Sequence, residues 1–152
     1  MDLQTGNYTI ASKAGNLFVG RKANEDRSLR PKQVVLRPKD ADRPEVSTWT
    51  IEALADGTYI LTIGGGRTAD INKLVNAVLL DQPPPTKWRI NPQFHQGQDT
   101  YTISLEKDTG EGWQAAVSPD VGQQITIKRY IVGRSFPPTY RPQDLFVITK
   151  LD

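Results

Sequence analysis

The chain repeats one short pattern three times: Gly6-Asn7-Tyr8-Thr9-Ile10, Gly57-Thr58-Tyr59-Ile60-Leu61 and Asp99-Thr100-Tyr101-Thr102-Ile103. In each copy a turn-forming residue is followed by a tyrosine and, two positions later, by an aliphatic residue. Side chains two positions apart lie on the same face of a β-strand, so each copy predicts a strand that buries its tyrosine and its aliphatic residue together. Recurrence over such long intervals also indicates internal repeats.

A second pattern closes each repeat. It places an aromatic residue two positions before an isoleucine, in Thr48-Trp49-Thr50-Ile51, Lys87-Trp88-Arg89-Ile90 and Leu145-Phe146-Val147-Ile148. The two patterns divide a single domain into three units of about four strands, residues 1–52, 53–92 and 93–152. Because one such unit cannot bury its apolar face alone, we predict an all-β fold in which three pseudo-repeats close around a barrel. An unrepeated β-sandwich is the alternative.

The inner strands of the units are less regular. We predict them at residues 17–19 and 34–36 in the first unit and at 113–117 and 125–127 in the third. In the second unit, residues 68–80 predict a long hairpin or a single helical turn. The threefold repeat with its Trp-x-Ile endings resembles the β-trefoil, a rigid barrel with variable loops. Function is therefore expected in the loops.

Composition narrows the classes of function. The 152 residues include no cysteine and one histidine, which excludes disulfides, thiolate nucleophiles and sulfur-ligated metals. We expect no cofactor and no metal. No apolar run reaches the length of a membrane span, and the polar start does not resemble a signal peptide, so we expect a cytoplasmic monomer. A net charge of +2 gives no global field for nucleic acid or membrane.

Positive charge is nevertheless concentrated in one segment. Between residues 21 and 43, basic residues outnumber acidic ones eight to four. The segment includes a long predicted loop, residues 21–33, and long structured loops are usually functional. Its central residues are Asn24, Glu25, Asp26, Arg27, Ser28 and Leu29. The short polar side chains before Arg27 can bond nearby backbone and stiffen the loop, and either Asn24 or Asn16 is expected to hold its backbone.

Arginine at the tip of a stiff convex loop indicates a specific kind of binding partner. The S1 pocket of a trypsin-like serine protease, with an aspartate at its base, accepts that shape and that charge. A merely solvated basic loop is the alternative. Catalysis by the chain itself is not indicated, because His95 lies in a Gly- and Gln-rich connection, no nucleophile elbow is present, and the acidic residues are scattered.

The whole chain resembles the mycospins, the β-trefoil serine protease inhibitors of mushrooms. The resemblance rests on the tyrosine-containing openings, the Trp49 and Trp88 closures, the lack of cysteine and the loop centred on Asp26-Arg27-Ser28. It implies that Arg27 enters the S1 pocket, that Arg27–Ser28 is the bond presented, and that the protein serves in defence. Phe146 stands where the third unit would carry tryptophan, which affects only core packing.

Other assignments remain open. Arg134-Ser135, stiffened by nearby prolines, is the alternative reactive site, whereas Arg67 follows a flexible run of glycines. Lys22 or Arg30 could be presented instead of Arg27. A β-trefoil lectin is a different class of function, in which Trp113 or Tyr140 would stack on a sugar. Inhibition of cysteine proteases is a third class; related mushroom inhibitors of that kind carry glycine in the corresponding loops, and residues 22–30 contain none.

Overall fold

A computed structural model describes residues 3–39 and 44–151 of the protein. Its strands are β1 (Gly6–Ser12), β2 (Phe18–Arg21), β3 (Lys32–Arg37), β4 (Trp49–Ala53), β5 (Tyr59–Ile63), β6 (Gly66–Ile71), β7 (Leu74–Val78), β8 (Trp88–Pro92), β9 (Thr100–Leu105), β10 (Glu111–Gln114), β11 (Thr126–Arg129) and β12 (Phe146–Lys150). Three short 3₁₀ segments, η1 (Pro44–Val46), η2 (Phe94–Gln96) and η3 (Pro142–Asp144), join them. No helix in the described part of the chain is long and apolar enough to cross a membrane.

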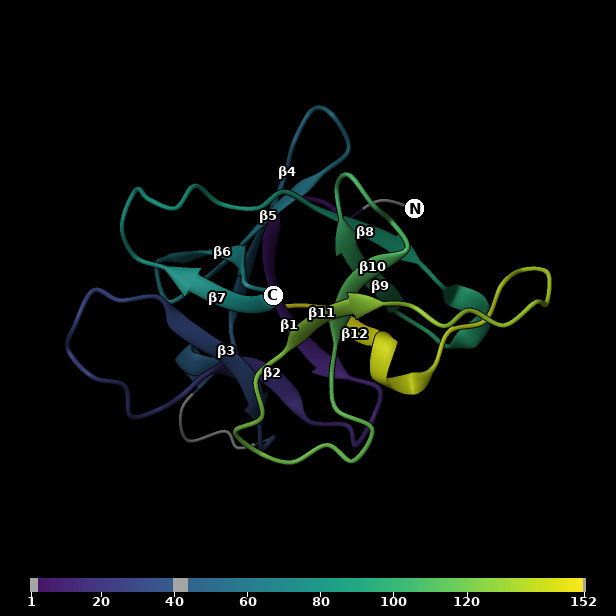
Figure 1. Ribbon diagram of the computed structural model, residues 1–152, viewed down its shortest axis with the longest axis horizontal. Helices are drawn as coiled ribbons and strands as arrows, with labels where there is room; N and C mark the ends of the chain where they lie inside the picture. Colours follow the sequence, from purple (N-terminus) through teal and green to yellow (C-terminus); the bar gives the residue numbers. More distant parts are fainter. Residues whose placement is uncertain (1–2, 40–43, 152) are drawn as a thin grey trace.

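Six of the strands close into a ring. The antiparallel pairs run β1–β4, β4–β5, β5–β8, β8–β9, β9–β12 and β12–β1. The hairpins β2–β3, β6–β7 and β10–β11 pair with one another through β7 and cover one end of the ring. Figure 1 shows the hairpins gathered around a common centre. Closure of this kind leaves the barrel strands without free edges, and the arrangement is a β-trefoil.

The opening and closing sequence patterns pair with each other on neighbouring strands of the barrel. Each opening tyrosine stands directly opposite a closing aromatic residue, in the pairs Tyr8 with Trp49, Tyr59 with Trp88 and Tyr101 with Phe146. These six side chains are all buried, as are the aliphatic residues two positions beyond them. The prediction that their common faces form one core is therefore confirmed.

Trp113 fills the centre of this core. It is fully buried, and its ring centroid lies 5.7 Å from that of Trp49, 5.4 Å from that of Trp88 and 6.1 Å from that of Phe146. The contacts with Trp88 and Phe146 are edge-to-face, the favoured geometry for aromatic quadrupoles. A single tryptophan from the third unit thus contacts the closing aromatic residue of every unit.

The inner strands differ in detail from the predictions. The segment 68–80, predicted as a hairpin or a helical turn, falls largely in the β6–β7 hairpin, which spans residues 66–78. The hairpin turn has positive φ at Asn72 and Lys73, as a two-residue hairpin turn requires. The strand predicted at 113–117 ends at Gln114, because the Ala115 N–H donates to the Gln143 carbonyl instead of continuing the ladder. The strand predicted at 17–19 begins at Phe18 and continues to Arg21.

The core tryptophans differ in one polar contact, which leads to a stability prediction. Trp88 Nε1 donates to Thr68 Oγ1 at 2.8 Å, whereas Trp113 Nε1 is buried and has no partner among the described residues. Both substitutions to phenylalanine shorten a buried ring, but only Trp88→Phe removes a hydrogen bond. We expect Trp88→Phe to lower the free energy of unfolding by about 1 kcal/mol more than Trp113→Phe. Urea unfolding of the two variants measures the difference, and a greater loss in Trp113→Phe would contradict the prediction.

Candidate functional site

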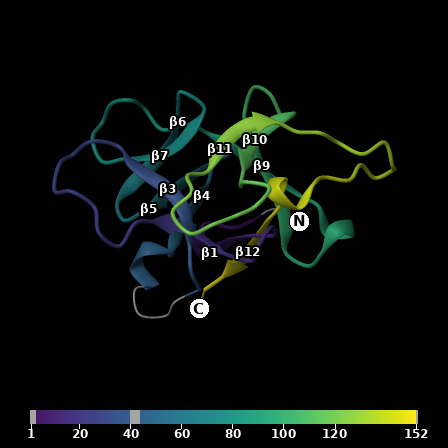
Figure 2. The ribbon, with the colours of Figure 1, turned by 60° about the horizontal axis from the view of Figure 1, so that its bottom comes forward.

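The loop between β2 and β3, residues 22–31 and called here the β2–β3 loop, projects from one end of the molecule. It is the dark blue segment at the left of Figure 1, and it also stays clear of the barrel in the turned view of Figure 2. Arg27, Leu29 and Arg30 near its tip are exposed. No residue of the loop has a positive φ, so its backbone avoids the left-handed region throughout. The loop therefore has the convex form that the sequence predicted.

An ion pair fixes the first limb of the loop. The Arg21 guanidinium, at the end of β2, donates to both oxygens of Glu25, with Nε–Oε2 at 3.0 Å and Nη2–Oε1 at 2.5 Å. The same guanidinium donates through Nη1 to the carbonyls of Ile63 (3.1 Å) and Gly64 (2.9 Å) in the β5–β6 turn. Both side chains are largely buried, and bidentate geometry of this kind is strong and directional. The limb is thus tied to the barrel.

A lysine supports the loop from within. Lys32 is the first residue of β3, and its side chain is only 7% exposed. Its ammonium group donates to the Asp26 carboxylate (Nζ–Oδ1 2.6 Å) and to the Asp26 carbonyl (3.1 Å). One buried cation therefore holds both the side chain and the backbone of the residue before Arg27.

The Asp26 carboxylate in turn holds the residue after Arg27. Its Oδ1 accepts a hydrogen bond from the Ser28 backbone N–H at 3.0 Å and another from the Ser28 hydroxyl at 2.5 Å. The Lys32 ammonium and these two bonds hold the pKa of the Asp26 carboxyl well below its usual range. Because its pKa is depressed, the carboxylate stays ionised below its ordinary pKa. The stabilisation from these contacts is complete above the ordinary pKa and is lost as the pH falls toward the lower value.

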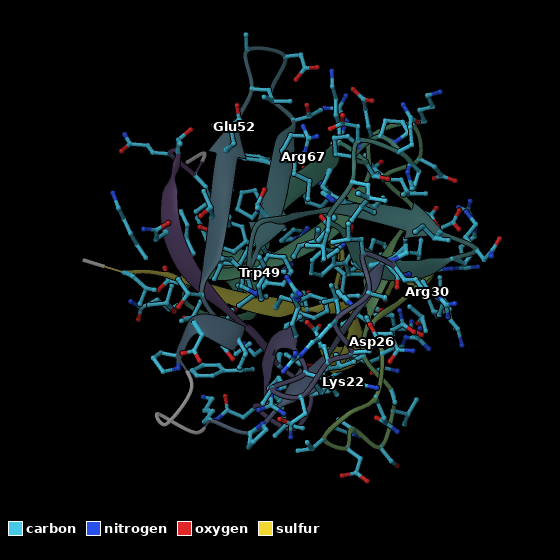
Figure 3. The ribbon with its side chains drawn as sticks, turned by 90° about the vertical axis from the view of Figure 1, so that its left-hand side faces the viewer. Lys22, Asp26, Arg30, Trp49, Glu52 and Arg67 are labelled. Atoms are coloured by element: carbon cyan, nitrogen blue, oxygen red, sulfur yellow. The ribbon has the colours of Figure 1, made fainter. Side chains whose placement is uncertain are left out.

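Arg27 itself is free of such contacts. Its exposed guanidinium forms no ion pair or hydrogen bond with any residue that the structure describes, although both of its chain neighbours are fixed. Leu29, two residues on, is 58% exposed. The structure thus brings Glu25, Asp26, Arg27, Ser28 and Leu29 together at a rigid tip with an available positive charge. Figure 3 views this end of the molecule and shows Lys22, Asp26 and Arg30 grouped along the loop, apart from Arg67.

The expected support of the loop by an asparagine is wrong. The side chain of Asn24 forms no hydrogen bond with a described residue, and Asn16 accepts from Lys39 Nζ at 2.8 Å, away from the loop. Lys32 supports the loop backbone instead, and the alternation of buried and exposed residues along β3 could have predicted that its side chain points inward. Lys32 has the same parity as Val34 and Leu36, which are both buried, so the period-2 pattern places it inward. Asp40, Asp42 and Arg43 of the basic segment lie outside the described residues.

The rival basic residues are less well placed. Arg67 lies in β6 and is paired on both sides, with Thr62 of β5 and with Val78 of β7. Arg30 precedes Pro31, so the following peptide nitrogen carries no hydrogen. Lys22 lies beside the barrel, in the limb fixed by Arg21, and the next residue along the chain is half-buried. Arg134 is exposed in a separate loop at the other end of the molecule.

Three residues considered for other chemistry have structural roles. Trp113, proposed above as a platform for a sugar, is buried in the core, so that assignment is wrong. Tyr140 is half-buried and packs edge-to-face on Tyr130. The imidazole of His95 donates through Nε2 to the Pro138 carbonyl at 2.7 Å, which ties two loops together. In the described parts of the chain, no group of three or more His, Asp or Glu residues is placed to hold a metal ion.

Comparison with known proteins gives this geometry its context. A family model described as "Peptidase inhibitor I66" matches residues 1–150. A serine protease inhibitor from Lentinula edodes is 41% identical over 151 residues, which cover 99% of each chain. A proteinase inhibitor from Coprinopsis cinerea has a structure with a TM-score of 0.90 and 30% identity, covering 99% of this chain and 100% of that one. The Rhizoctonia solani agglutinin, with a TM-score of 0.72, 11% identity and 99% coverage of both chains, shares the fold alone.

Fold, loop and relatives together define a protease inhibitor rather than an enzyme. The chain belongs to the peptidase inhibitor I66 family. The match spans nearly the whole chain, so the β2–β3 loop lies inside the shared domain. Serine proteases are accordingly the class of target that the relatives indicate.

Proposed function

We propose that the protein inhibits trypsin-like serine proteases by inserting Arg27 into the S1 pocket and presenting the Arg27–Ser28 peptide bond to the catalytic serine. The observation that carries this proposal is the hydrogen bond from the Ser28 N–H to the Asp26 carboxylate, which Lys32 holds in place. This bond fixes the Ser28 nitrogen, which would be the leaving group on cleavage, and it does not engage the Arg27 guanidinium. A guanidinium matches the aspartate at the base of a trypsin-like S1 pocket in both charge and geometry.

The same contact explains why such a loop would inhibit rather than be consumed. When the catalytic serine attacks the Arg27 carbonyl carbon, the bond to the Ser28 nitrogen breaks and that nitrogen leaves as an amine. A flexible substrate would then lose its leaving segment. Here the Asp26 carboxylate retains Ser28, and the barrel holds β2 and β3 on either side through their ladder. The amine stays beside the acyl group at high effective concentration, so the peptide bond re-forms.

The order of the loop before binding favours high affinity for the protease, because little conformational entropy is lost on binding. Binding an unstructured segment costs about 0.5–1.5 kcal/mol for each side chain that becomes ordered. In this loop Glu25, Asp26 and Ser28 are ordered before any protease arrives. The two carboxylates that precede Arg27 are already paired with Arg21 and Lys32, so neither neutralises the guanidinium that the protease must accept.

A panel of active-site-titrated enzymes tests the proposal. We expect inhibition of trypsin, and no inhibition of papain or of chymotrypsin, whose S1 pocket lacks the aspartate. Brief incubation with trypsin followed by mass spectrometry is expected to find a nick between Arg27 and Ser28 in a minor fraction of the inhibitor. Inhibition of papain instead of trypsin would contradict the proposal, as would binding to a glycan array without inhibition of any protease.

A further inference from the structure

The connection from β7 to β8, residues 79–87 and called here the β7–β8 loop, projects from the same end of the molecule as the β2–β3 loop. Figure 1 shows it in teal at the left, above the dark blue β2–β3 loop, and Figure 2 shows both loops at the same end in the turned view. Residues 80–84 are all exposed, and no residue of the β7–β8 loop has a positive φ. The β2–β3 loop therefore has a projecting neighbour.

Strand pairing decides which side of the presented bond this neighbour flanks. β3 and β7 are antiparallel, and Lys32, the first residue of β3, is paired with Ala77 near the end of β7. From this pair, the chain runs backward from β3 into the residues that follow the presented bond, and forward from β7 into the β7–β8 loop. Three residues beyond the pair in each direction lie Leu29 and Leu80. The β7–β8 loop thus flanks the leaving side of the bond.

Both of these leucines are exposed. Leu29 is 58% exposed and Leu80 is 52% exposed, although leucine is among the residues most often buried. The residue before Leu80 behaves differently, because Leu79 is half-buried and its Cδ2 lies 3.2 Å from the position that a Cβ would take at Gly66. One leucine of the β7–β8 loop is therefore used by the fold, and the next offers its apolar surface to a partner.

The far limb of the β7–β8 loop is anchored on β6. The Thr86 N–H donates to the Thr68 carbonyl at 3.0 Å, and the Thr86 hydroxyl accepts from the Asp70 N–H at 2.8 Å. Between the two limbs, residues 83–85 are all proline, which restricts φ at three successive positions. A loop with few conformations to lose binds a partner at a small entropic cost.

The β2–β3 loop alone is smaller than the surface that a stable protease–inhibitor complex uses. Such an interface involves about 20–30 residues of each partner, whereas this loop is confined to residues 22–31. A protease bound at Arg27 is therefore expected to contact neighbouring segments as well. The β5–β6 turn, which contacts Arg21 at the end of β2, consists of Gly64 and Gly65 and has no side chain to offer. The β7–β8 loop offers an exposed leucine.

We infer that the β7–β8 loop is a second contact surface for the same protease molecule, with Leu80 and Leu29 packing on an apolar strip of the enzyme on the leaving side of the catalytic serine. The inference rests on the proposed insertion of Arg27 into the S1 pocket, and it adds a determinant of specificity. Arg27 selects proteases that cleave after arginine, and Leu80 selects among them. A protease with a charged side chain in place of the strip would bury that charge against Leu80 without a partner and bind more weakly.

The test measures binding to a trypsin whose catalytic serine is replaced by alanine, which binds without cutting. Every variant also carries Arg134→Glu, so that the alternative Arg134–Ser135 bond does not contribute. We expect Leu80→Asp to weaken binding about 30-fold, mainly through faster dissociation, because it replaces an apolar contact with a carboxylate that lacks a partner. Leu80→Met, which keeps an apolar side chain of similar volume, is expected to bind within about twofold of the parent chain.

Val117→Asp is the matched control. Val117 is 78% exposed in the connection from β10 to β11, which lies at the bottom of Figure 1, away from both loops. This variant is expected to bind trypsin as the parent chain does. Hydrogen exchange provides a second readout, since the backbone N–H groups of residues 80–82 are expected to exchange more slowly in the complex, and that of Val117 at an unchanged rate.

Binding of Leu80→Asp as tight as that of Val117→Asp, together with loss of binding in Arg27→Glu, would overturn the inference and leave the Arg27 proposal intact. Undiminished binding by Arg27→Glu would overturn both. Self-association of the inhibitor that Leu80→Asp removes, with its affinity for trypsin unchanged, would show that this surface joins two copies of the chain instead. Weaker binding by Leu80→Asp with an unchanged midpoint of thermal unfolding, and rescue by Leu80→Met, supports the inference.

Discussion

Arg27→Glu is expected to weaken the inhibition of trypsin by at least about 1,000-fold when it is measured in the Arg134→Glu background, which leaves the β2–β3 loop as the site under test. An arginine anchor buried in a protease pocket contributes about 4 kcal/mol or more, and the substitution also places a carboxylate against the aspartate of the S1 pocket. The quantity to measure is the inhibition constant for active-site-titrated trypsin.

The fold is expected to survive this change. Arg27 is exposed and contacts no described side chain through its guanidinium, so the midpoint of thermal unfolding should stay within the range of a surface substitution. Arg67→Glu in the same background is the matched control, because Arg67 is also exposed but lies within a strand. Equal inhibition by the Arg27→Glu variant and its Arg67→Glu control would place the site on another part of the surface.

The barrel was predictable because its signal is local. Tyr8 and Ile10, or Trp49 and Ile51, share a face through the two-residue period of a strand, and a threefold copy of that period is visible in the chain itself. The end of β10 was not predictable in this way. It depends on the Ala115 N–H finding the Gln143 carbonyl, a partner brought close only by the completed barrel.

The β2–β3 loop shows the same division. Its position, its exposure and its free Arg27 follow from composition and from the turn residues around it. The support by Lys32 does not, because a lysine on the inner face of β3 is acceptable only if an anion meets it there, and that anion comes from the folded loop. Likewise, Trp113 is an aromatic residue in a short apolar stretch, and only the packing of three units decides that it is central and not exposed.

Lys32→Met is expected to turn the inhibitor into a substrate at the Arg27–Ser28 bond. Methionine has a similar length and fits a buried position, but it offers no donor to the Asp26 carbonyl or carboxylate. The side chains of Asp26 and Ser28 then regain freedom at about 0.5–1.5 kcal/mol each, and the leaving amine is retained less well. We expect trypsin to cut the bond about 30- to 100-fold faster than in the wild-type protein.

The experiment follows cleavage with time, by mass spectrometry of fragments 1–27 and 28–152, alongside recovery of trypsin activity. Lys39→Met is the control, since Lys39 is an exposed lysine that bonds Asn16 and lies outside the loop. A titration of the Asp26 carboxyl by NMR separates the cause from general loosening, because loss of the ammonium group is expected to raise the pKa of Asp26 toward its usual range. A Lys32→Met variant that is cut no faster than Lys39→Met, with the pKa of Asp26 raised, would show that the barrel alone keeps the loop ready for religation.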